Sequence, residues 1–181
     1  MANPGGSIVP VRRPAAFLDR DGVLNVDRGY VYRVEDFEWL PGAIEAVKWL
    51  NARGYYVFVV SNQGAVAFGR YTEDDVLHLF AHMQRELAAQ GAKLDDYRYC
   101  PDHPDGEIAR YRKASDWRKP GPGMILDLMR HWEVDAARSF LLGNKPTDIA
   151  AAQAAGIAGH LYTGSNVRDA VQAIVGATAC G

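Results

Sequence analysis

The apolar positions of the chain follow two alternating patterns, which predict strands and helices in turn. Short, nearly continuous apolar runs are typical of strands buried on both faces, whereas a spacing of three and four residues is typical of amphipathic helices. Strands are expected at 15–18, 55–60, 94–100, 139–142 and 157–162, and helices at 41–54, 72–87, 121–131, 146–155 and 167–175. This alternation predicts βαβ units and therefore an α/β fold with a mainly parallel sheet and helices on both faces.

Single residues mark where two of these helices begin. Pro41 suits the first turn of a helix whose apolar face consists of Ile44, Val47 and Leu50. Thr72 is a suitable N-cap for the next helix. The residues at helical spacing after this N-cap, which we interpret as core, are Val76, Leu79, Phe80, Met83 and Leu87.

Two segments lack periodicity and are expected to be loops. Residues 25–32 form a mixed polar and aromatic stretch, placed where a flap could cover the end of the first strand. Residues 101–119 form a polar loop of a length that usually has a function. We expect both segments to carry substrate specificity, because they flank the predicted strand ends.

The size and composition of the chain predict one domain. With 181 residues, of which 48% are hydrophobic, the chain can bury one substantial core. We place the domain at 14–176, between an N-terminal tail at 1–13 and a C-terminal tail at 177–181. The apolar runs are too short to span a membrane, and the first residues do not resemble a signal peptide. We therefore expect a cytoplasmic monomer that does not bind membranes.

The charge balance argues against nucleic acid as a partner. The 20 basic and 22 acidic residues give a formal net charge of −2, which provides no basic field for a polyanion. Cys100 and Cys180 lie far apart in the sequence, so we interpret them as free thiols in a reducing compartment.

The first predicted strand ends in two carboxylates, Asp19 and Asp21, followed by a glycine. Open α/β sheets bind their ligands beyond the carboxyl ends of the strands. The leading hypothesis is phosphoryl transfer, in which one aspartate attacks phosphorus while the other exchanges protons with the leaving oxygen and with water. A magnesium ion would hold the nucleophile and the phosphate together. Alternatively the segment is a surface turn, because Asp and Gly are common turn residues.

Three further polar segments follow predicted strands or precede predicted helices, so they could meet Asp19 at one edge of the sheet. The Ser61 hydroxyl could bind a phosphate oxygen, Lys119 could neutralise phosphate charge, and Asp148 could complete a metal site. Each segment also has a structural explanation: a turn, a solvated lysine, and an acid that complements a helix dipole. The order of all four segments favours the functional interpretation.

Together these motifs resemble those of the haloacid dehalogenase superfamily of phosphotransferases. The segments that carry the likeness are FLDRDG at 17–22, SNQ at 61–63, RKP at 118–120 and GNK at 143–145. More narrowly, NVDRGYV at 25–31, DFE at 36–38 and CPDHPDG at 100–106 are similar to the D-glycero-D-manno-heptose 1,7-bisphosphate phosphatases and the related histidinol-phosphate phosphatases. The likeness runs from about residue 14 to 163 and implies a three-layer, Rossmann-like fold without a cap domain.

The resemblance implies a role for each motif residue. The catalytic residues would be Asp19 as nucleophile, Asp21 as general acid and base, Ser61 and Lys119. The substrate-binding residues would be Asn62, Gln63, Arg118, Arg28 and Lys145. The magnesium ligands would be Asp19, Asp21 through its backbone carbonyl, Asn144 and Asp148.

The implied reaction is magnesium-dependent removal of the 7-phosphate of a heptose bisphosphate through an aspartyl phosphate. Its product would lead toward the nucleotide-activated heptose of lipopolysaccharide, capsule or other surface glycans. Histidinol phosphate is the nearest alternative substrate, and Asp102, Asp105 or Glu107 could then meet its ammonium group. A catalytically impaired phosphosugar-binding protein is the alternative from another class, prompted by Asn144.

Two substitutions depart from the family pattern around the site. Asn144 stands where the family usually has an aspartate, so we expect weaker magnesium binding, because an amide brings no negative charge. Phe68 stands where the heptose enzymes often have an arginine, which can contact a phosphate bidentately. Arg70 or Arg28 could supply that charge instead.

The long loop also departs from the pattern, because relatives often hold a structural zinc there. Ser115 and Trp117 replace expected cysteines, and Cys100 and His103 alone do not make a four-ligand site, so we expect no structural zinc. We expect aromatic packing to order the loop instead, through Tyr99, Tyr111 and Trp117.

Overall fold

The computed structural model describes residues 12–178 and places five parallel strands in one sheet, in the order β3-β2-β1-β4-β5. The strands are β1 (Ala15–Leu18), β2 (Tyr56–Asn62), β3 (Asp96–Cys100), β4 (Phe140–Gly143) and β5 (Ala158–Leu161). Phe17 of the central strand pairs with Phe58 on one side and with Leu141 on the other. Every residue of β1 is buried, as its continuous apolar run predicts, and the expected α/β class is confirmed.

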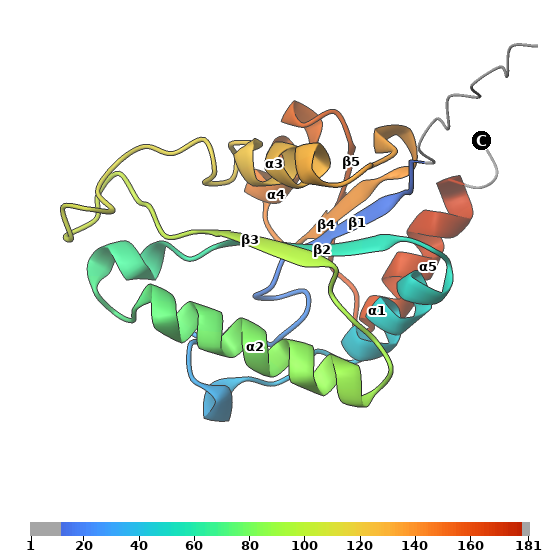
Figure 1. Ribbon diagram of the computed structural model, residues 1–181, viewed down its shortest axis with the longest axis horizontal. Helices are drawn as coiled ribbons and strands as arrows, with labels where there is room; N and C mark the ends of the chain where they lie inside the picture. Colours follow the sequence, from blue (N-terminus) through green and yellow to red (C-terminus); the bar gives the residue numbers. More distant parts are fainter. Residues whose placement is uncertain (1–11, 179–181) are drawn as a thin grey trace, which may run out of the picture.

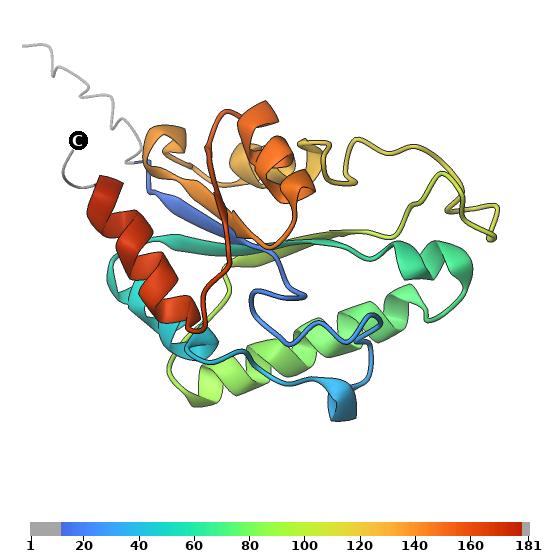
Figure 2. The same ribbon diagram turned by 180° about the vertical axis from the view of Figure 1, so that it is seen from behind.

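Helices cover both faces of the sheet (Figures 1 and 2). They are α1 (Ala43–Ala52), α2 (Glu73–Ala89), α3 (Gly123–His131), α4 (Pro146–Ala154) and α5 (Val167–Thr178). Ala16 and Leu18 of β1 point into a core shared with α1, α2 and α5, whereas Ala15 and Phe17 point into a second core shared with α3 and α4. The two-residue period of a strand therefore divides the interior into two cores and gives the molecule three layers.

The two predicted helix starts have different outcomes. Thr72 is the N-cap of α2, because its hydroxyl accepts a hydrogen bond from the Asp75 amide at 3.2 Å and the Asp75 carboxylate accepts one from the Thr72 amide. Pro41 does not lie in the first turn of α1, so that prediction is wrong. The N-cap is Gly42, with φ of +78°, and a Cβ there would lie 2.1 Å from Oδ1 of Asn166.

Some boundaries differ from the prediction for local reasons. β3 begins at Asp96 instead of residue 94, because both backbone groups of Leu94 bond to the side chain of Gln84 at 2.9 and 3.0 Å. Residues 1–11 and 179–181 of the predicted tails lie outside the described part. Arg13 pairs with Val134 and α5 reaches Thr178, so regular structure extends past both expected limits of 14 and 176.

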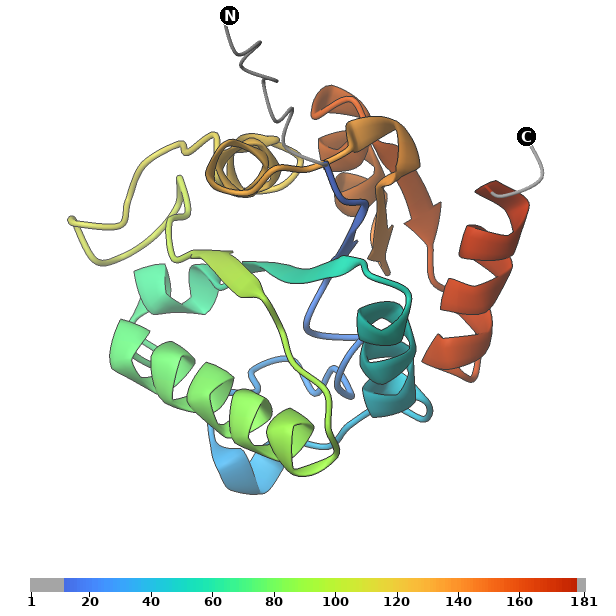
Figure 3. The same cartoon turned by 45° about the vertical axis from the view of Figure 1, so that its right-hand side comes forward.

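The long loop between β3 and α3 runs beside the short helix at 64–68 (Figure 3). The amides of Glu107 and Ile108 both donate to the Ala67 carbonyl there. The hydroxyls of Tyr99 and Tyr111 donate to Glu73 of α2 at 2.8 and 2.6 Å, so two of the three predicted aromatics hold the loop. Trp117, the third of the set, is 36% exposed, and its ring lies beside Gly123 of α3, where a Cβ would lie 2.8 Å from Cδ1 of the ring.

Among residues 12–178, no helix has the length and apolar character that crossing a membrane would require.

Candidate active site

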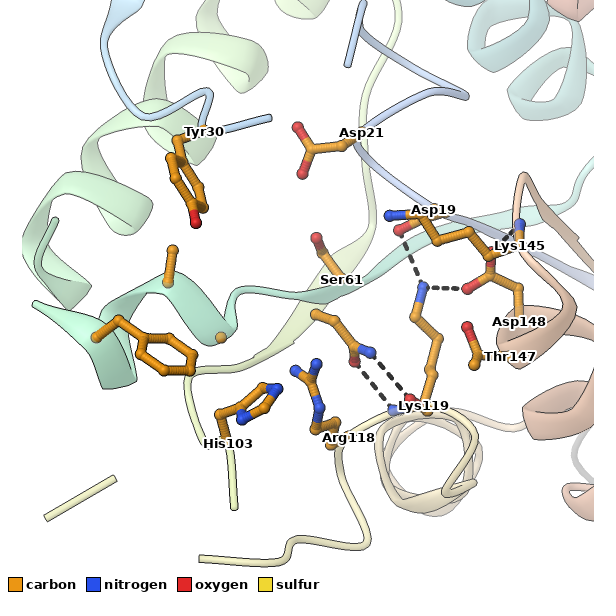
Figure 4. A pocket seen from close by; sticks show the side chains of 14 residues that line it. Asp19, Asp21, Tyr30, Ser61, His103, Arg118, Lys119, Lys145, Thr147 and Asp148 are labelled. Carbon is orange, nitrogen blue, oxygen red and sulfur yellow. Dashed lines mark hydrogen bonds and ion pairs between the residues drawn. The ribbon is translucent and has the colours of Figure 1, made fainter. Parts of the chain in front are cut away.

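The first cluster of the site is a buried lysine between two aspartates that end or follow neighbouring strands (Figure 4). Nζ of Lys119 lies 2.9 Å from Oδ1 of Asp19 and 2.7 Å from Oδ1 of Asp148, and it also donates to the Val60 carbonyl at 2.8 Å. The three charged side chains are at most 9% exposed. Burying so many charges is costly unless each is paired, so this cluster fixes all three side chains in position.

The ion pairing sets the protonation of this cluster. Burial lowers the pKa of Lys119, but the two carboxylates outweigh burial, and the net pKa is raised. Lys119 is therefore a permanent ammonium. Burial raises the pKa of Asp19, with Lys119 opposing the shift and Asp148 adding to it. The two hydrogen bonds that residues 12–178 donate to the Asp19 carboxylate, from Lys119 and from the Arg20 amide, both fall on Oδ1.

The second cluster surrounds Asp21 and is built from hydrogen-bond donors. Arg20 contacts both oxygens of Asp21 at 2.9 to 3.2 Å. The side-chain amide of Asn25 donates to Oδ1, and that of Gln63 donates to Oδ2, each at 3.0 Å. Arg20 is itself 1% exposed and donates to the Val31 carbonyl at 2.7 Å. The orientation of Asp21 is therefore fixed from three directions.

The end of β2 supplies two polar side chains with different tasks. Oγ of Ser61 accepts a hydrogen bond from Gln63 at 2.7 Å, so its own proton is available for a ligand in the cavity. The carboxamide of Asn62 is engaged at both ends by the backbone of Lys119, at 2.9 and 3.0 Å. Asn62 was expected to bind phosphate, but here it ties β2 to the loop that carries Lys119.

A cavity of about 360 Å³ opens where these clusters meet. The expected site residues that line it are Asp19, Asp21, Ser61, Asn62, Arg118, Lys119, Lys145 and Asp148. Tyr30, Phe68, His103 and Thr147 complete much of its wall, and Figure 4 shows Tyr30 from the flap facing the side that carries His103. The rings of Phe68 and His103 lie 5.0 Å apart, so one wall of the cavity is aromatic.

Two of the expected substrate-binding residues do not line this cavity. Arg28 is paired with Glu38, and both side chains are more than half exposed. Gln63 is 1% exposed and is consumed by its contacts with Ser61 and Asp21. Arg70 is exposed and is likewise absent from the lining, so neither candidate replaces the arginine expected at Phe68.

Asn144 at the end of β4 has the donor chemistry that a hard cation requires. Its Oδ1 is buried and has no hydrogen-bond partner among residues 12–178. The carboxamide approaches Gly22 so closely that a Cβ at Gly22 would lie 2.0 Å from Nδ2. Oδ2 of Asp148 is occupied by the Lys145 amide at 2.9 Å. An unpaired amide oxygen beside the loop of Asp19 and Asp21 fits a magnesium ligand.

Cys100 and His103, the two remaining candidates for a zinc site, point to different surroundings. Among residues 12–178, no group of three or more His, Cys, Asp and Glu side chains is placed to hold a metal. Sγ of Cys100 contacts the Asp102 carbonyl at 3.9 Å, and burial raises the pKa of this thiol. His103 faces the main cavity instead. Cys180, the other cysteine, lies outside the described residues.

Sequence reasoning missed Arg20 and Tyr71. Arg20 stands between two acids and looks like a surface residue, yet its guanidinium is buried against Asp21 and Val31. Tyr71 precedes the N-cap Thr72, a position where an apolar residue often packs on the helix, and this accounts for the burial of its ring but not for its hydroxyl, which lies 2.5 Å from Oε1 of Gln63. A spacing rule for N-caps could have flagged Tyr71 as buried, but not its hydroxyl contact.

Comparison with known proteins places this site in a family. The HAD-hydrolase-like family model matches residues 116–179. A D-glycero-beta-D-manno-heptose-1,7-bisphosphate 7-phosphatase of Rhodopseudomonas palustris is 52% identical over 156 residues, 86% of this chain and 87% of that protein.

Two solved structures share the fold. A HAD-like phosphatase from Mesorhizobium loti matches with a TM-score of 0.84 and 29% identity, over 96% of this chain and 90% of the other. The D,D-heptose 1,7-bisphosphate phosphatase from B. bronchiseptica, complexed with magnesium and phosphate, matches with a TM-score of 0.75 and 30% identity, over 88% of this chain and 86% of the other. The chain belongs to the haloacid dehalogenase-like phosphatases, in the group that includes the heptose bisphosphate phosphatases.

Proposed function

We propose that this protein is a magnesium-dependent phosphatase that removes the 7-phosphate of D-glycero-β-D-manno-heptose 1,7-bisphosphate. The single observation that carries the chemistry is the pair of aspartates at one cavity, Asp19 held by an ammonium and Asp21 held by hydrogen-bond donors. The substrate is supported by the names of the similar proteins, one of them 52% identical. The proposal includes the cytoplasmic location and the monomeric state expected from the sequence.

In the first step, Oδ2 of Asp19 attacks the phosphorus of the 7-phosphate. The bond between phosphorus and the sugar oxygen breaks, and Asp21 in its protonated form gives its proton to that oxygen. The Ser61 hydroxyl donates to a phosphate oxygen, and the Lys119 ammonium offsets the negative charge that Asp19 and the phosphate bring together. The products are an aspartyl phosphate on Asp19 and the free sugar hydroxyl.

In the second step, Asp21 acts as a base, because it lost its proton to the sugar oxygen in the first step. Its carboxylate takes a proton from a water molecule, and the water oxygen attacks the phosphorus of the aspartyl phosphate. The bond between phosphorus and Oδ2 breaks, which restores Asp19 and releases inorganic phosphate. The donors around Asp21 keep it at the same place for both proton transfers.

Magnesium would be held by the Asp19 carboxylate, the Asp21 backbone carbonyl and Oδ1 of Asn144, with Asp148 acting on the site through Lys119. When bound, the ion supplies positive charge that draws phosphate oxygens to the nucleophile. Asn144 contributes an oxygen without a charge, so this site binds magnesium more weakly than one with aspartate there.

The rest of the substrate would lie along the cavity wall away from Asp19. Arg118 and Lys145 line the cavity and offer positive charge for the second phosphate. The ring of Phe68 packs on His103 and offers a stacking surface in place of an arginine. The acids considered for histidinol phosphate, Asp102, Asp105 and Glu107, do not line this cavity, so no contact favours that substrate.

The test is phosphate release with magnesium from a panel of phosphate esters. The panel contains both anomers of heptose 1,7-bisphosphate, fructose 1,6-bisphosphate and histidinol phosphate, with Asp19→Asn as the blank. We expect release from the β-heptose bisphosphate that the blank lacks. Binding without release across the whole panel would support the catalytically impaired alternative and contradict the proposal.

A further inference from the structure

A hydrogen-bond chain connects Tyr71 through Gln63 to Asp21 and is not explained by the reaction steps above. The hydroxyl of Tyr71, which is 8% exposed, lies 2.5 Å from Oε1 of Gln63. Nε2 of the same amide donates to Ser61 at 2.7 Å and to Asp21 at 3.0 Å. One side-chain amide therefore contacts the proposed proton donor, the proposed phosphate ligand and a tyrosine that does not line the main cavity.

The direction of these hydrogen bonds matters, because an amide can be turned by 180° with little change in shape. With Oε1 toward Tyr71, the donor end of Gln63 faces Asp21 and Ser61. In the turned orientation, Oε1 would face the Asp21 carboxylate and two acceptors would meet. Burial raises the pKa of Tyr71 to about 12, so its hydroxyl keeps its proton and serves as a donor to Oε1. Arg20 reaches the same oxygen only at 3.4 Å.

We propose that Tyr71 is a positioning residue for proton transfer, which holds the Gln63 amide so that its donor end orients the Asp21 carboxylate. The inference rests on the proposed phosphatase function. It also connects that function to the flap, because the Tyr71 ring stacks on Tyr32 at 5.1 Å and meets the edge of Tyr30, a cavity residue, at 6.5 Å.

Tyr71→Phe tests this role, because it keeps the stacked ring and removes only the hydroxyl. The leaving oxygen of an alkyl ester needs a proton, whereas p-nitrophenolate leaves without one. kcat/KM covers the steps up to the aspartyl phosphate. We expect kcat/KM to fall about tenfold for heptose 1,7-bisphosphate and less than about twofold for p-nitrophenyl phosphate. If wild type rejects the heptose ester, fructose 1,6-bisphosphate takes its place, so an error in the substrate does not affect this comparison.

Two further variants distinguish positioning from a general structural effect. Tyr55→Phe removes the hydroxyl of another tyrosine that is 8% exposed, one that directly precedes β2 and does not line the cavity, and we expect it to leave both esters unchanged. Gln63→Leu should reproduce the selective loss, and adding Tyr71→Phe to it should cause no further loss, because both act on one amide. Equal losses for the two esters, or no loss, would overturn the proposal.

A measurement without turnover keeps the inference testable if no ester is hydrolysed. The side-chain amide of Gln63 gives a pair of signals in a ¹H–¹⁵N spectrum, identified by their absence in Gln63→Leu. We expect Tyr71→Phe to shift this pair and Tyr55→Phe to leave it in place. An unmoved pair in Tyr71→Phe would show that the hydroxyl does not hold the amide.

Discussion

The two aspartates of the site lie two residues apart, but their surroundings differ in kind. Asp19 is buried in a cluster of full charges, in which one ammonium is shared by two carboxylates. Asp21 faces the cavity and is held by Arg20 and two side-chain amides. The surroundings of Asp19 offset its negative charge, whereas the surroundings of Asp21 fix the orientation of its carboxylate. A nucleophile must approach a negatively charged phosphate, whereas an acid and base must point at the transferred proton, so each environment suits one role.

Removing each carboxylate separately gives the largest expected effects. Asp19→Asn should lower phosphate release by at least about 10⁴-fold, because no covalent intermediate can form. Asp21→Asn should lower it by about 10²- to 10⁴-fold, because only proton transfer is lost. Steady-state assays with an alkyl phosphate measure both. Equal activity of Asp19→Asn and wild type would show that Asp19 is not the nucleophile.

Lys119→Met tests whether the charged cluster depends on its single ammonium. The variant leaves the buried carboxylates of Asp19 and Asp148 without the ammonium that they share, so we expect the free energy of unfolding to fall by about 3–5 kcal/mol. Activity should fall by about 10²- to 10³-fold. Lys48→Met, an exposed lysine of α1, is the matched control and should change neither. Denaturant unfolding at neutral pH provides the measurement, and equal midpoints for the two variants would refute the pairing.

Asn144→Asp tests whether residue 144 binds magnesium beside the two aspartates. The added carboxylate should lower the magnesium concentration needed for half-maximal activity by about tenfold, because Mg²⁺ prefers charged oxygen ligands. Asn144→Ala removes the oxygen and should raise the same concentration. A magnesium titration of the three proteins gives the order. If all three coincide, Asn144 is not a ligand and its buried Oδ1 needs another explanation.

The smallest expected effect concerns stability and pH in the absence of metal. Because burial raises the pKa of Asp19, the folded state binds a proton at this carboxyl more tightly than the unfolded chain does. Wild type should therefore lose stability as the pH rises from the unfolded pKa of about 4 through the raised folded pKa. Asp19→Asn lacks this loss, so its advantage in thermal midpoint should grow with pH and vanish in acid. Scans in chelator across the range measure it, and a variant less stable than wild type at pH 7 would show that pairing with Lys119 outweighs burial.

The sequence was sufficient to predict the layers of the fold and the strand ends that carry the site. Continuous apolar runs identified the buried strands. Asp19 and Asp21 directly follow β1, and the carboxyl ends of parallel strands are where open α/β sheets place their active sites. The same logic placed Ser61 and Lys119 at one edge of the sheet.

The contacts of individual side chains could not be predicted, because partners distant in sequence decide them. Asn62 was expected to face phosphate, yet its carboxamide bonds to a backbone 57 residues away. Arg28 was expected at the substrate and pairs with Glu38 instead. Arg20 is buried only because Val31 and Gln63 converge on it from separate segments.

The most direct test of the account is to trap the covalent intermediate in Asp21→Asn. With p-nitrophenyl phosphate the first step needs no proton donor, whereas the second step needs the base that this variant lacks. We predict that rapid acid quenching and peptide mass spectrometry will find one added phosphoryl group on the peptide that contains Asp19, at a higher level than in wild type. A phosphoryl group on another residue, or phosphate release with no adduct at any time, would contradict the division of roles between Asp19 and Asp21.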